Sequence, residues 1–279
     1  MIDTEDEGIR LNKFLSHNTK HSRREADELI KAGKIKMKGV VVEDLSKKVY
    51  KGDKVYLHGQ FVHRKNEFTV LVYNKLKGEL VTKKDDRGRK TIFDNFSKRY
   101  HHYLPVGRLD YASEGLILLT DSPEIATLLM TSSLDRVYYV KIRGLVTEMM
   151  EEAMKRGLHA DIATKGGHSH SKITSMDFKP FVQYKIIKSA PNFSRLKVTI
   201  SEGQNRELRR FFGYFDAEVT DLKRVEFGGI SLDTLNPGKH RFLSKGEYHS
   251  LHTYMEGIKL EKVKEKRKMQ KDEERQKRD

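Results

Sequence analysis

The stretch that decides the fold reads Gly107-Arg108-Leu109-Asp110-Tyr111-Ala112-Ser113-Glu114-Gly115-Leu116-Ile117-Leu118-Leu119-Thr120. One carboxylate, Asp110, directly follows an Arg-Leu pair, and the apolar run 116–119 predicts a buried strand. Gly107 and Gly115 bracket the loop and allow tight turns at both ends. An Arg-Leu-Asp triplet by itself is typical of an ordinary loop. Together with the strand and the glycines, it predicts an aspartate held rigidly against a core.

The composition of the chain favours a partner that carries phosphate. The 279 residues have a formal net charge of +15 and a pI near 9.6. Such an excess of positive charge is typical of proteins that bind nucleic acid or an acidic membrane surface. No apolar run approaches the roughly 18 residues that a membrane span needs. The composition therefore favours a nucleic-acid-binding protein, with DNA and RNA both open.

Two further features of the composition narrow the class of protein. Residues 1–7 are acidic, which is the opposite of the basic start of a signal peptide. The chain has no cysteine, which excludes disulfides, thiolate nucleophiles and zinc held by cysteine. We therefore expect a cytoplasmic protein with no membrane partner.

Residues 8–59 are expected to form a small α/β unit. Ser22 and Glu25 have the spacing of a capping box, which predicts a helix that ends near Gly33. Basic and apolar residues alternate over 34–40, which predicts a hairpin with one basic face.

The charge of this first unit is lopsided, because residues 8–58 hold 13 Lys and Arg against six Asp and Glu. Arg23 and Arg24 fall in the first turn of the expected helix, where free N–H groups and the helix dipole favour anions. An ordinary solvated surface is the alternative interpretation of such a run. We interpret Arg23, Arg24 and Lys36 as candidates for phosphate binding.

Residues 60–255 are expected to form a second, larger unit. Strands are predicted at 68–73, 137–142 and 196–200, and helices at 125–130, 149–156 and 205–212. The connections are too short for a parallel doubly wound sheet, so the pattern favours an α+β domain with a largely antiparallel sheet. Residues 256–279 are basic and poor in apolar side chains, which predicts a helical or disordered tail that adds nonspecific RNA affinity.

The segment from Glu202 to Arg210 supplies several arginines on a predicted helix. One of them could pair with Asp110. Such a pair keeps a partly buried carboxylate ionised, as a nucleophile requires.

Residues 107–120 resemble the Gly-Arg-Leu-Asp signature of RNA pseudouridine synthases, most closely the RsuA/RluB/RluF-like group that acts on single sites of ribosomal RNA. Residues 8–59 are also similar to the small RNA-binding domain named after a small-subunit ribosomal protein. Four further segments resemble motifs of the family in the family's order: Tyr73 to Thr82, Asp86 to Ile92, Arg136 to Lys141, and Glu202 to Arg210.

The resemblance implies a fold and an activity. The fold would be α+β, with the small α/β RNA-binding domain followed by a mixed, largely antiparallel-sheet catalytic domain with a central cleft. The activity would be isomerisation of one uridine to pseudouridine in ribosomal RNA, with large-subunit RNA expected and small-subunit RNA left open. The partner would be structured 23S-type RNA or an assembly intermediate, bound by a monomer. No cofactor or metal is expected, because the isomerisation involves no net redox change.

The resemblance also implies roles for particular residues. Asp110 would attack the flipped-out uridine, either at the ribose or at the pyrimidine ring. Tyr138 would lie against the target base and take part in the final proton removal. Arg209 occupies the basic position that pairs with the aspartate in the family. The expected RNA contacts are made by Leu208 beside the base, Arg108 in the bent RNA, Arg89 at phosphate, and Asn205 and Arg206 on the arginine-rich helix.

Three positions depart from the family pattern. Leu76 stands where proline is usual, which puts the rigidity of that loop in doubt. Glu207 stands where glutamine is usual and would place a carboxylate near RNA. His240 stands where tryptophan is usual, and we interpret that tryptophan as structural.

Other interpretations remain open beside the enzyme. A noncatalytic RNA-binding or ribosome-assembly factor could keep the same fold, and a basic DNA-binding protein is a weaker alternative. The loop 166–171 contains two histidines, but with no cysteine or nearby carboxylate it is expected to be a flexible polar loop rather than a metal site. Tyr139 is expected to point away from Tyr138, because neighbours in a strand alternate, and to pack in the core.

Overall fold

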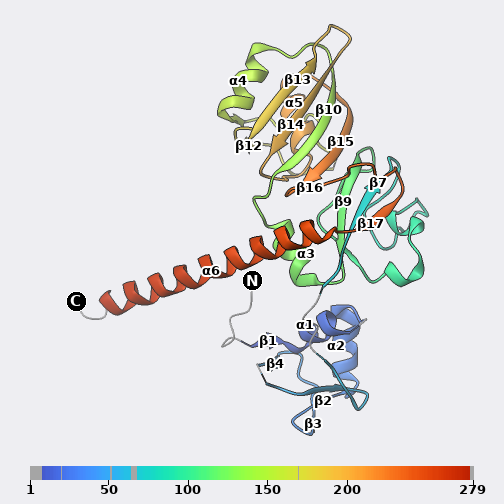
Figure 1. Ribbon diagram of the computed structural model, residues 1–279, viewed down its shortest axis with the longest axis vertical. Coiled ribbons are helices and arrows are strands. Elements are labelled where there is room, and N and C mark those ends of the chain that lie inside the picture. Colours follow the sequence, from blue (N-terminus) through green and yellow to red (C-terminus); the bar gives the residue numbers. More distant parts are fainter. Residues whose placement is uncertain (1–7, 20, 51, 64–67, 169, 277–279) are drawn as a thin grey trace.

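The computed structural model describes residues 8–19, 21–50, 52–63, 68–168 and 170–276. The chain forms a small N-terminal unit, a larger unit built on one long sheet, and a C-terminal helix that extends away from the body (Figure 1). Within the described residues, no helix is long and apolar enough to cross a membrane.

The N-terminal unit packs two helices against short strands. Its apolar core includes Leu11, Phe14 and Ile30. Its elements are β1 (Ile9–Arg10), α1 (Leu11–Asn18), α2 (Arg23–Lys31), β2 (Ile35–Met37), β3 (Val40–Val41), β4 (Lys48–Val49), β5 (Val55–Leu57) and β6 (Gln60–Phe61). Strand β1 pairs with β4, and the other four form a sheet in the order β3-β2-β5-β6.

Two local predictions for this unit are confirmed. The Glu25 N–H donates to Ser22 Oγ at 3.3 Å and the Ser22 N–H donates to the Glu25 carboxylate at 2.6 Å, which is a complete capping box. The hairpin between β2 and β3 turns at Lys38 and Gly39, both with positive φ. The sequence also predicts a turn over Lys51-Gly52-Asp53, and its first residue lies outside the described residues.

The large sheet is mixed and mostly antiparallel, as predicted. Its strand order is β13-β14-β10-β15-β9-β7-β17, with β8 beside β9 and β16 beside β15. These strands are β7 (Val70–Lys75), β8 (Leu104–Pro105), β9 (Glu114–Thr120), β10 (Arg136–Arg143), β13 (Gln183–Lys188), β14 (Phe193–Ile200), β15 (Val219–Phe227), β16 (Ile230–Ser231) and β17 (His240–Phe242). A separate pair is formed by β11 (Leu158–Ala160) and β12 (Met176–Phe178). The helices are α3 (Pro123–Met130), α4 (Glu148–Arg156), α5 (Glu207–Tyr214) and α6 (Lys245–Gln276), with two 3-10 turns at Ile92–Asn95 and Lys98–Tyr100.

The sheet consists of two antiparallel halves joined by one short parallel pairing. Strand β9 meets β15 only at Glu114 opposite Lys223 and at Gly115 opposite Arg224. Gly115 has a φ of 104°, and a Cβ added there would lie 2.1 Å from the Arg224 carbonyl oxygen. The buried Arg224 side chain donates from Nε to the Leu116 carbonyl at 2.7 Å. The two halves can therefore approach this closely only because residue 115 has no side chain.

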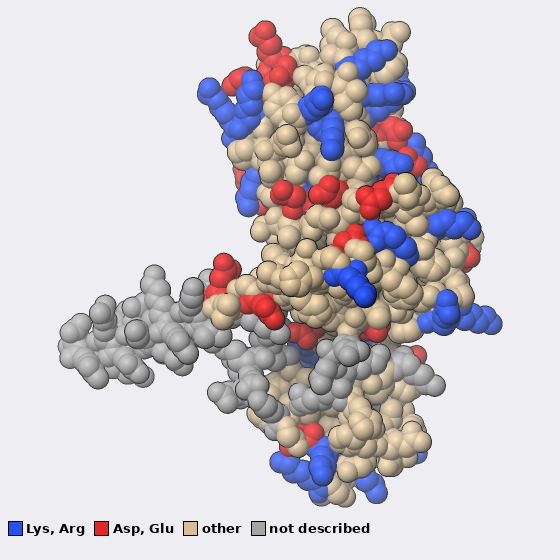
Figure 2. All heavy atoms as spheres, viewed as in Figure 1, with Lys and Arg blue, Asp and Glu red and all other residues tan. Residues whose placement is uncertain are grey.

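The two halves of the sheet are buried differently. Side chains on β7 and β9 alternate between two apolar clusters, so this half is covered on both faces. One cluster contains Tyr73 and Ile117 with the segment 92–103, and the other contains Val72 and Leu118 with α3 and the start of α6. In the other half, one face of β10, β13, β14 and β15 packs on α4 and α5, whereas side chains of the opposite face are exposed. Figure 2 shows Lys and Arg side chains over the part of the molecule that holds these strands.

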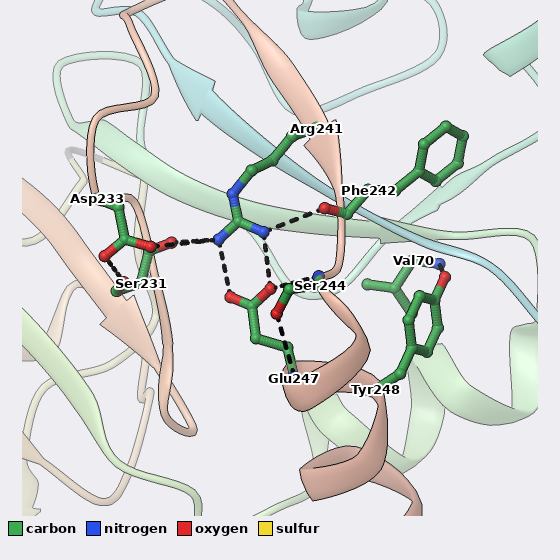
Figure 3. A network of polar contacts seen from close by, with 8 residues as sticks. All are labelled: Val70, Ser231, Asp233, Arg241, Phe242, Ser244, Glu247 and Tyr248. Carbon is green, nitrogen blue, oxygen red and sulfur yellow. Dashed lines mark hydrogen bonds and ion pairs between the residues drawn. The ribbon is translucent and has the colours of Figure 1, made fainter.

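The helix α6 is anchored at its first turn. Glu247 caps it together with Ser244, whose N–H donates to the Glu247 carboxylate at 2.7 Å (Figure 3). Arg241 of β17 forms two 2.7 Å hydrogen bonds with the same carboxylate. The Val70 N–H donates to the Tyr248 hydroxyl at 3.0 Å, which ties the helix to β7. The helix runs through residues 255 and 256, where the sequence suggested that a separate tail begins.

His240 belongs to an aromatic cluster between β17 and the turns at 92–100. Its ring lies 4.8 Å from that of Phe96 and 5.2 Å from that of Tyr100. Burial, together with the nearby charges of Arg99 and Lys239, lowers the pKa of the His240 imidazole. Histidine therefore fills the position with a flat ring, but it does so best when it is neutral.

Gly115→Ala is expected to lower the free energy of unfolding by at least about 3 kcal/mol, because strain at positive φ adds to a collision with backbone that cannot move. Gly107→Ala is the matched control. Its φ is 71°, but nothing lies within 4 Å of an added Cβ, so it should cost only about 1–2 kcal/mol. Urea unfolding of both variants measures the difference, and equal losses would contradict the account of the junction.

The His240 environment predicts a pH dependence of stability. Because the folded pKa lies below that of the unfolded chain, the unfolded state takes up the proton first as pH falls. The contribution of neutral His240 to the free energy of unfolding is thus fully present above pH 6.5, the ordinary pKa of histidine. It is lost as pH falls through the folded pKa. His240→Phe should flatten the decline of unfolding free energy below pH 6.5, whereas His249→Phe, at an exposed position, should leave it as in the wild type. Urea titrations at several pH values provide the test.

Candidate active site

Asp110 lies in the loop before β9, between two arginines from the start of α5. Its Oδ2 is 3.0 Å from Arg206 Nη1 and 3.4 Å from Arg209 Nε, and its side chain is 31% exposed. Its other oxygen, Oδ1, has no hydrogen-bond or ion-pair partner among the described residues. The structure thus brings Asp110 and Arg209 together, as the sequence suggested, and adds Arg206 as a closer partner. The arrangement holds one carboxylate oxygen and leaves the other available.

The two arginines are themselves fixed by the backbone. Arg209 donates from Nη1 to the Val219 carbonyl at 2.9 Å and from Nη2 to Ser113 Oγ at 3.2 Å. Arg206 donates from Nε to the Gly166 carbonyl at 2.6 Å. Burial and the neighbouring Arg206 charge lower the pKa of the Arg209 guanidinium, and the Asp110 carboxylate opposes that effect. The two guanidinium groups are therefore held in place by these hydrogen bonds and do not depend on the aspartate for their positions.

Lys75, the last residue of β7, holds the Asp110 loop from behind. Its side chain is fully buried, and Nζ donates to the carbonyls of Leu76 at 2.9 Å, Asp110 at 3.1 Å and Ser113 at 2.7 Å. Burial lowers the pKa of Lys75 to about 8, against the opposing charges of Glu79, Asp110 and Glu114. Lys75 lies in the segment from Tyr73 to Thr82 that resembles a family motif, but the resemblance implied no role for it. The available signal was a lysine that ends an otherwise apolar strand.

An apolar wall lies on the same side of the sheet. Tyr138, Leu109 and Leu208 are buried in one cluster, contributed by β10, the Asp110 loop and α5. The Tyr138 hydroxyl makes no hydrogen bond to any described residue. One aromatic and two aliphatic side chains of this kind suit contact with a planar, uncharged ring.

Tyr139 corrects one expectation. It does point away from Tyr138, but it is not in the core: its side chain is 45% exposed on the open face of the sheet. The alternation of the strand was correct, and the assumption that both faces are covered was wrong.

The other residues predicted to contact RNA lie partly in the Asp110 loop and partly in other segments of the fold. Arg108 is exposed in the same loop. Arg89 is exposed and binds Asp85, with Nη2 to Oδ1 at 2.7 Å and Nε to Oδ2 at 3.2 Å. The acid that organises this loop is therefore Asp85, one residue before the Asp86 with which the motif was aligned. Arg23, Arg24 and Lys36 are exposed on the N-terminal unit.

Asn205 turns inward to a structural partner. Its backbone carbonyl accepts from Arg210 Nε at 3.0 Å and its Oδ1 accepts from Arg210 Nη2 at 3.3 Å. Arg210 is fully buried and also donates to the carbonyl of Ala163 and to Ser171 Oγ. The sequence does not indicate this role, because the spacing of the arginines predicts only one basic face of the helix.

Two departures from the family pattern are accommodated by burial. Glu207 is buried, and its Oε2 accepts the Gln204 N–H at 2.8 Å. Burial raises the pKa of this carboxyl, so the expectation that Glu207 presents a carboxylate to RNA is wrong. The Leu76 N–H donates to the buried Glu79 carboxylate at 3.1 Å, which holds the loop where proline is usual.

The loop 166–171 supports α5. The Gly166 carbonyl accepts from Arg206, and a Cβ at Gly166 would lie 2.0 Å from the Arg209 carbonyl oxygen. The loop is therefore packed rather than merely flexible and polar; Ser169 lies outside the described residues. Over the part of the chain that the structure describes, no group of three or more His, Asp or Glu side chains could hold a metal ion.

Two surface hollows lie beside the segment 229–247 rather than at Asp110. One has a volume of about 710 Å³ and includes Arg241 and Glu247 in its lining. The other, of about 500 Å³, is lined in part by Tyr139 and Lys223. Asp110 lines neither.

Comparison with protein families gives two matches along the chain. Residues 69–214 match the model described as RNA pseudouridylate synthase, and residues 9–55 match the S4 domain. The first match contains Asp110, Tyr138, Arg206 and Arg209.

Comparison with individual proteins agrees. The chain is 48% identical to an uncharacterized RNA pseudouridine synthase of Helicobacter pylori (strain J99) over 249 residues, which cover 88% of this chain and 95% of that protein. It is 35% identical to the ribosomal large subunit pseudouridine synthase B of Bacillus subtilis (strain 168) over 244 residues, 87% of this chain and 95% of that one. A crystal structure of a pseudouridylate synthase superposes with a TM-score of 0.59 and 25% identity, covering 87% of this chain and 99% of the other.

Lys75→Met is expected to destabilise the protein by about 2–4 kcal/mol, because it leaves buried carbonyls of the Asp110 loop without a donor. The effect should also depend on pH. The folded pKa, about 8, lies below the ordinary 10.5, so the unfolded chain binds more protons between these values. The wild type should therefore gain stability relative to the variant as pH rises from about 8 to 10.5. Urea unfolding across this range checks both the loss and its sign, with the exposed Lys77→Met as control.

Proposed function

The chain belongs to the RNA pseudouridylate synthase family and carries an S4 domain, and we propose that it converts one uridine of ribosomal RNA to pseudouridine with Asp110 as the nucleophile. Enzymes of this family are RNA isomerases. The observation that carries the proposal is the fixed carboxylate: one oxygen of Asp110 is held by Arg206 and Arg209, and the other has no partner among the described residues.

The ion pairs suit a nucleophilic carboxylate. Two guanidinium groups hold Oδ2 of Asp110 in place, which leaves Oδ1 positioned for attack. We place the attack at C1′ of the ribose, where a C–O bond forms as the N1–C1′ bond breaks and its electron pair leaves with the base. Attack at the pyrimidine ring would use the same carboxylate oxygen.

The same cations serve the second half of the reaction. Once Asp110 is esterified it is neutral, so Arg206 and Arg209 face the anion of the departed uracil and stabilise it. The base rotates, C5 forms the new bond to C1′, and the carboxylate leaves. The proton on C5 is then removed and N1 is protonated, so that atoms and electrons balance without a cofactor.

The apolar wall explains how the base is held during rotation. Flipping a base from a helix costs a few kcal/mol, and stacking on an aromatic ring returns about 1–3 kcal/mol. We propose that the uracil lies against Tyr138 and Leu208, with Leu109 completing the surface. The Tyr138 hydroxyl has no partner among the described residues, which makes it our candidate for removing the C5 proton.

Several other groups are proposed to hold the RNA around Asp110. Arg108, beside the aspartate, would keep the bent RNA open. Arg89 would contact phosphate from the Asp85 loop, although its pairing with Asp85 must loosen first. Asn205 is assigned a support role through Arg210 rather than a direct contact.

The substrate is proposed to be structured large-subunit ribosomal RNA, with small-subunit RNA as the alternative. Support comes from the relative of Bacillus subtilis, whose name specifies the large ribosomal subunit. The N-terminal unit would bind that RNA through Arg23, Arg24 and Lys36, all exposed. We propose that the protein acts as a cytoplasmic monomer, with residues 8–59 and 60–255 as RNA-binding and catalytic domains and the basic segment 256–279 adding affinity.

A noncatalytic RNA-binding factor is the competing function. It would need a basic surface, but not a carboxylate clamped between arginines that are themselves bound to Gly166 and Val219. The arrangement at Asp110 therefore favours the enzyme.

Asp110→Asn is expected to abolish pseudouridine formation, by at least about four orders of magnitude in rate, while leaving RNA affinity within about threefold of the wild type. The amide keeps the shape of the side chain but cannot act as the nucleophile. Formation is measured by mapping pseudouridines in ribosomal RNA from cells that lack the gene and are complemented with either variant, and affinity by filter binding.

Asp121→Asn, at the far end of β9, serves as the control and should keep activity. A parallel loss of RNA binding in Asp110→Asn would show that the aspartate is structural. A pseudouridine map that is the same with and without the gene would refute the proposed substrate.

A further inference from the structure

The open face of the sheet half formed by β10, β13, β14 and β15 carries basic and aromatic side chains that the proposed reaction does not use. Tyr138, Val140 and Ile142 of β10 project to the opposite, buried face. Besides Arg143, which pairs with Glu218, six cations occur on these strands at positions that project to the open side: Lys141, Lys185, Lys188, Arg195, Lys197 and Lys223. Acidic residues are fewer there, with Glu226 and Asp221 on β15, and Asp221 is already paired with Lys77.

These cations are not neutralised by the protein. Within the described residues none of the six forms an ion pair with a carboxylate. Elsewhere on the surface the pattern differs; for example, Lys155 and Arg156 of α4 both pair with Glu152. The open face therefore presents a positive potential to solvent.

The cross-strand register places like charges opposite one another. Lys185 pairs with Lys197, and Lys188 pairs with Arg195, in adjacent antiparallel strands. Like charges directly opposite destabilise a sheet. A bound polyanion would remove this repulsion, whereas an unliganded face gains nothing from it.

An aromatic ring fixes three of the cations in place. The charged groups of Lys141, Lys188 and Arg195 lie 4.5, 4.6 and 5.5 Å from the centre of the Phe193 ring. Cation–π contacts of this kind order a side chain without cancelling its charge. The positive groups are thus held in position for a ligand that carries negative charge at regular spacing.

A second aromatic ring is free to contact a ligand. Tyr139 is directly opposite Lys197 on one side and Lys223 on the other, and its side chain is 45% exposed. Tyr139 and Lys223 also line the hollow of about 500 Å³ that reaches to Pro237. An exposed ring between two lysines, beside a hollow, suits a stacked base with phosphates on either side.

We propose that this open face is a second RNA-binding surface, which takes a single-stranded segment of the substrate RNA with one base stacked on Tyr139. The charge complementarity of the face favours RNA over a protein partner. This inference rests on the proposed function only in that the substrate is RNA. It adds a contact on the side of the sheet opposite Tyr138, so the RNA would pass around the edge of the domain.

The test compares full-length variants in binding to a fluorescent oligouridine of roughly 12 nucleotides. Arg195→Ala/Lys197→Ala should weaken binding by roughly tenfold and reduce the slope of log affinity against log salt by about 1.4, since each single-strand phosphate contact contributes about 0.7. The control Lys155→Ala/Arg156→Ala removes the same charge from α4 and should stay within about twofold of the wild type. Equal effects of the two double variants would overturn the proposal.

Tyr139 gives an independent readout that does not depend on charge. Tyr139→Ala should weaken oligouridine binding by about tenfold, whereas Tyr139→Phe should keep wild-type affinity because the ring remains. Unchanged affinity in Tyr139→Ala refutes the stacking site. If the variant kept its RNA affinity but lost binding to a protein partner, that result would also refute the proposed RNA surface.

The same variants separate this proposal from the proposed function. Pseudouridine formation in ribosomal RNA is measured for the wild type in parallel. If the wild type forms none, yet Arg195→Ala/Lys197→Ala still loses oligouridine affinity, the surface stands and the proposed function fails. If the wild type is active and the double variant binds as well as the wild type, only the surface fails.

Discussion

The close contact between β9 and β15 is the constraint on which the rest of the catalytic domain depends. Two antiparallel half-sheets meet there over two residue pairs, and Gly115 lets the Arg224 backbone approach within a distance that no side chain permits. The contact places the loop before β9, in one half-sheet, beside α5, which packs on the other half-sheet. Asp110 comes from the first half, and Arg206 and Arg209 come from the second. The ion pairs at the site are therefore a consequence of how the sheet is joined.

Buried cations of this domain bind backbone carbonyls. Lys75 binds three of them, and Arg224 binds that of Leu116. Arg136 binds the carbonyls of Leu134 and Ser201, and Arg210 binds those of Asn205 and Ala163. A hydrogen bond to a carbonyl oxygen stabilises a buried charge without a carboxylate. The backbone therefore compensates for the hydration that the charge loses on burial. Part of the net positive charge of the chain thus serves the fold rather than RNA.

Much of the architecture could be predicted from the sequence, because local patterns determine it. The capping box at Ser22 and Glu25, the strands and the mostly antiparallel sheet all follow from spacing and alternation. What could not be predicted depends on contacts between distant segments. The orientation of Arg210, the burial of Glu207 and the role of Lys75 are set by how other segments of the chain pack around them. Tyr139 shows the same limit, since alternation gives its direction but not whether that face is covered.

The way in which Lys75 holds the Asp110 loop leaves the loop free to change. Lys75 binds the carbonyls of Asp110 and Ser113, and the Gly78 N–H binds that of Tyr111, so these bonds recognise backbone rather than side chains. Tyr111 and Ala112 are exposed between these attachment points. Substitutions at these two positions can alter what the loop presents to RNA while the attachment is kept. The fold therefore separates the part of the loop that holds Asp110 from the part that can vary while the attachment is kept.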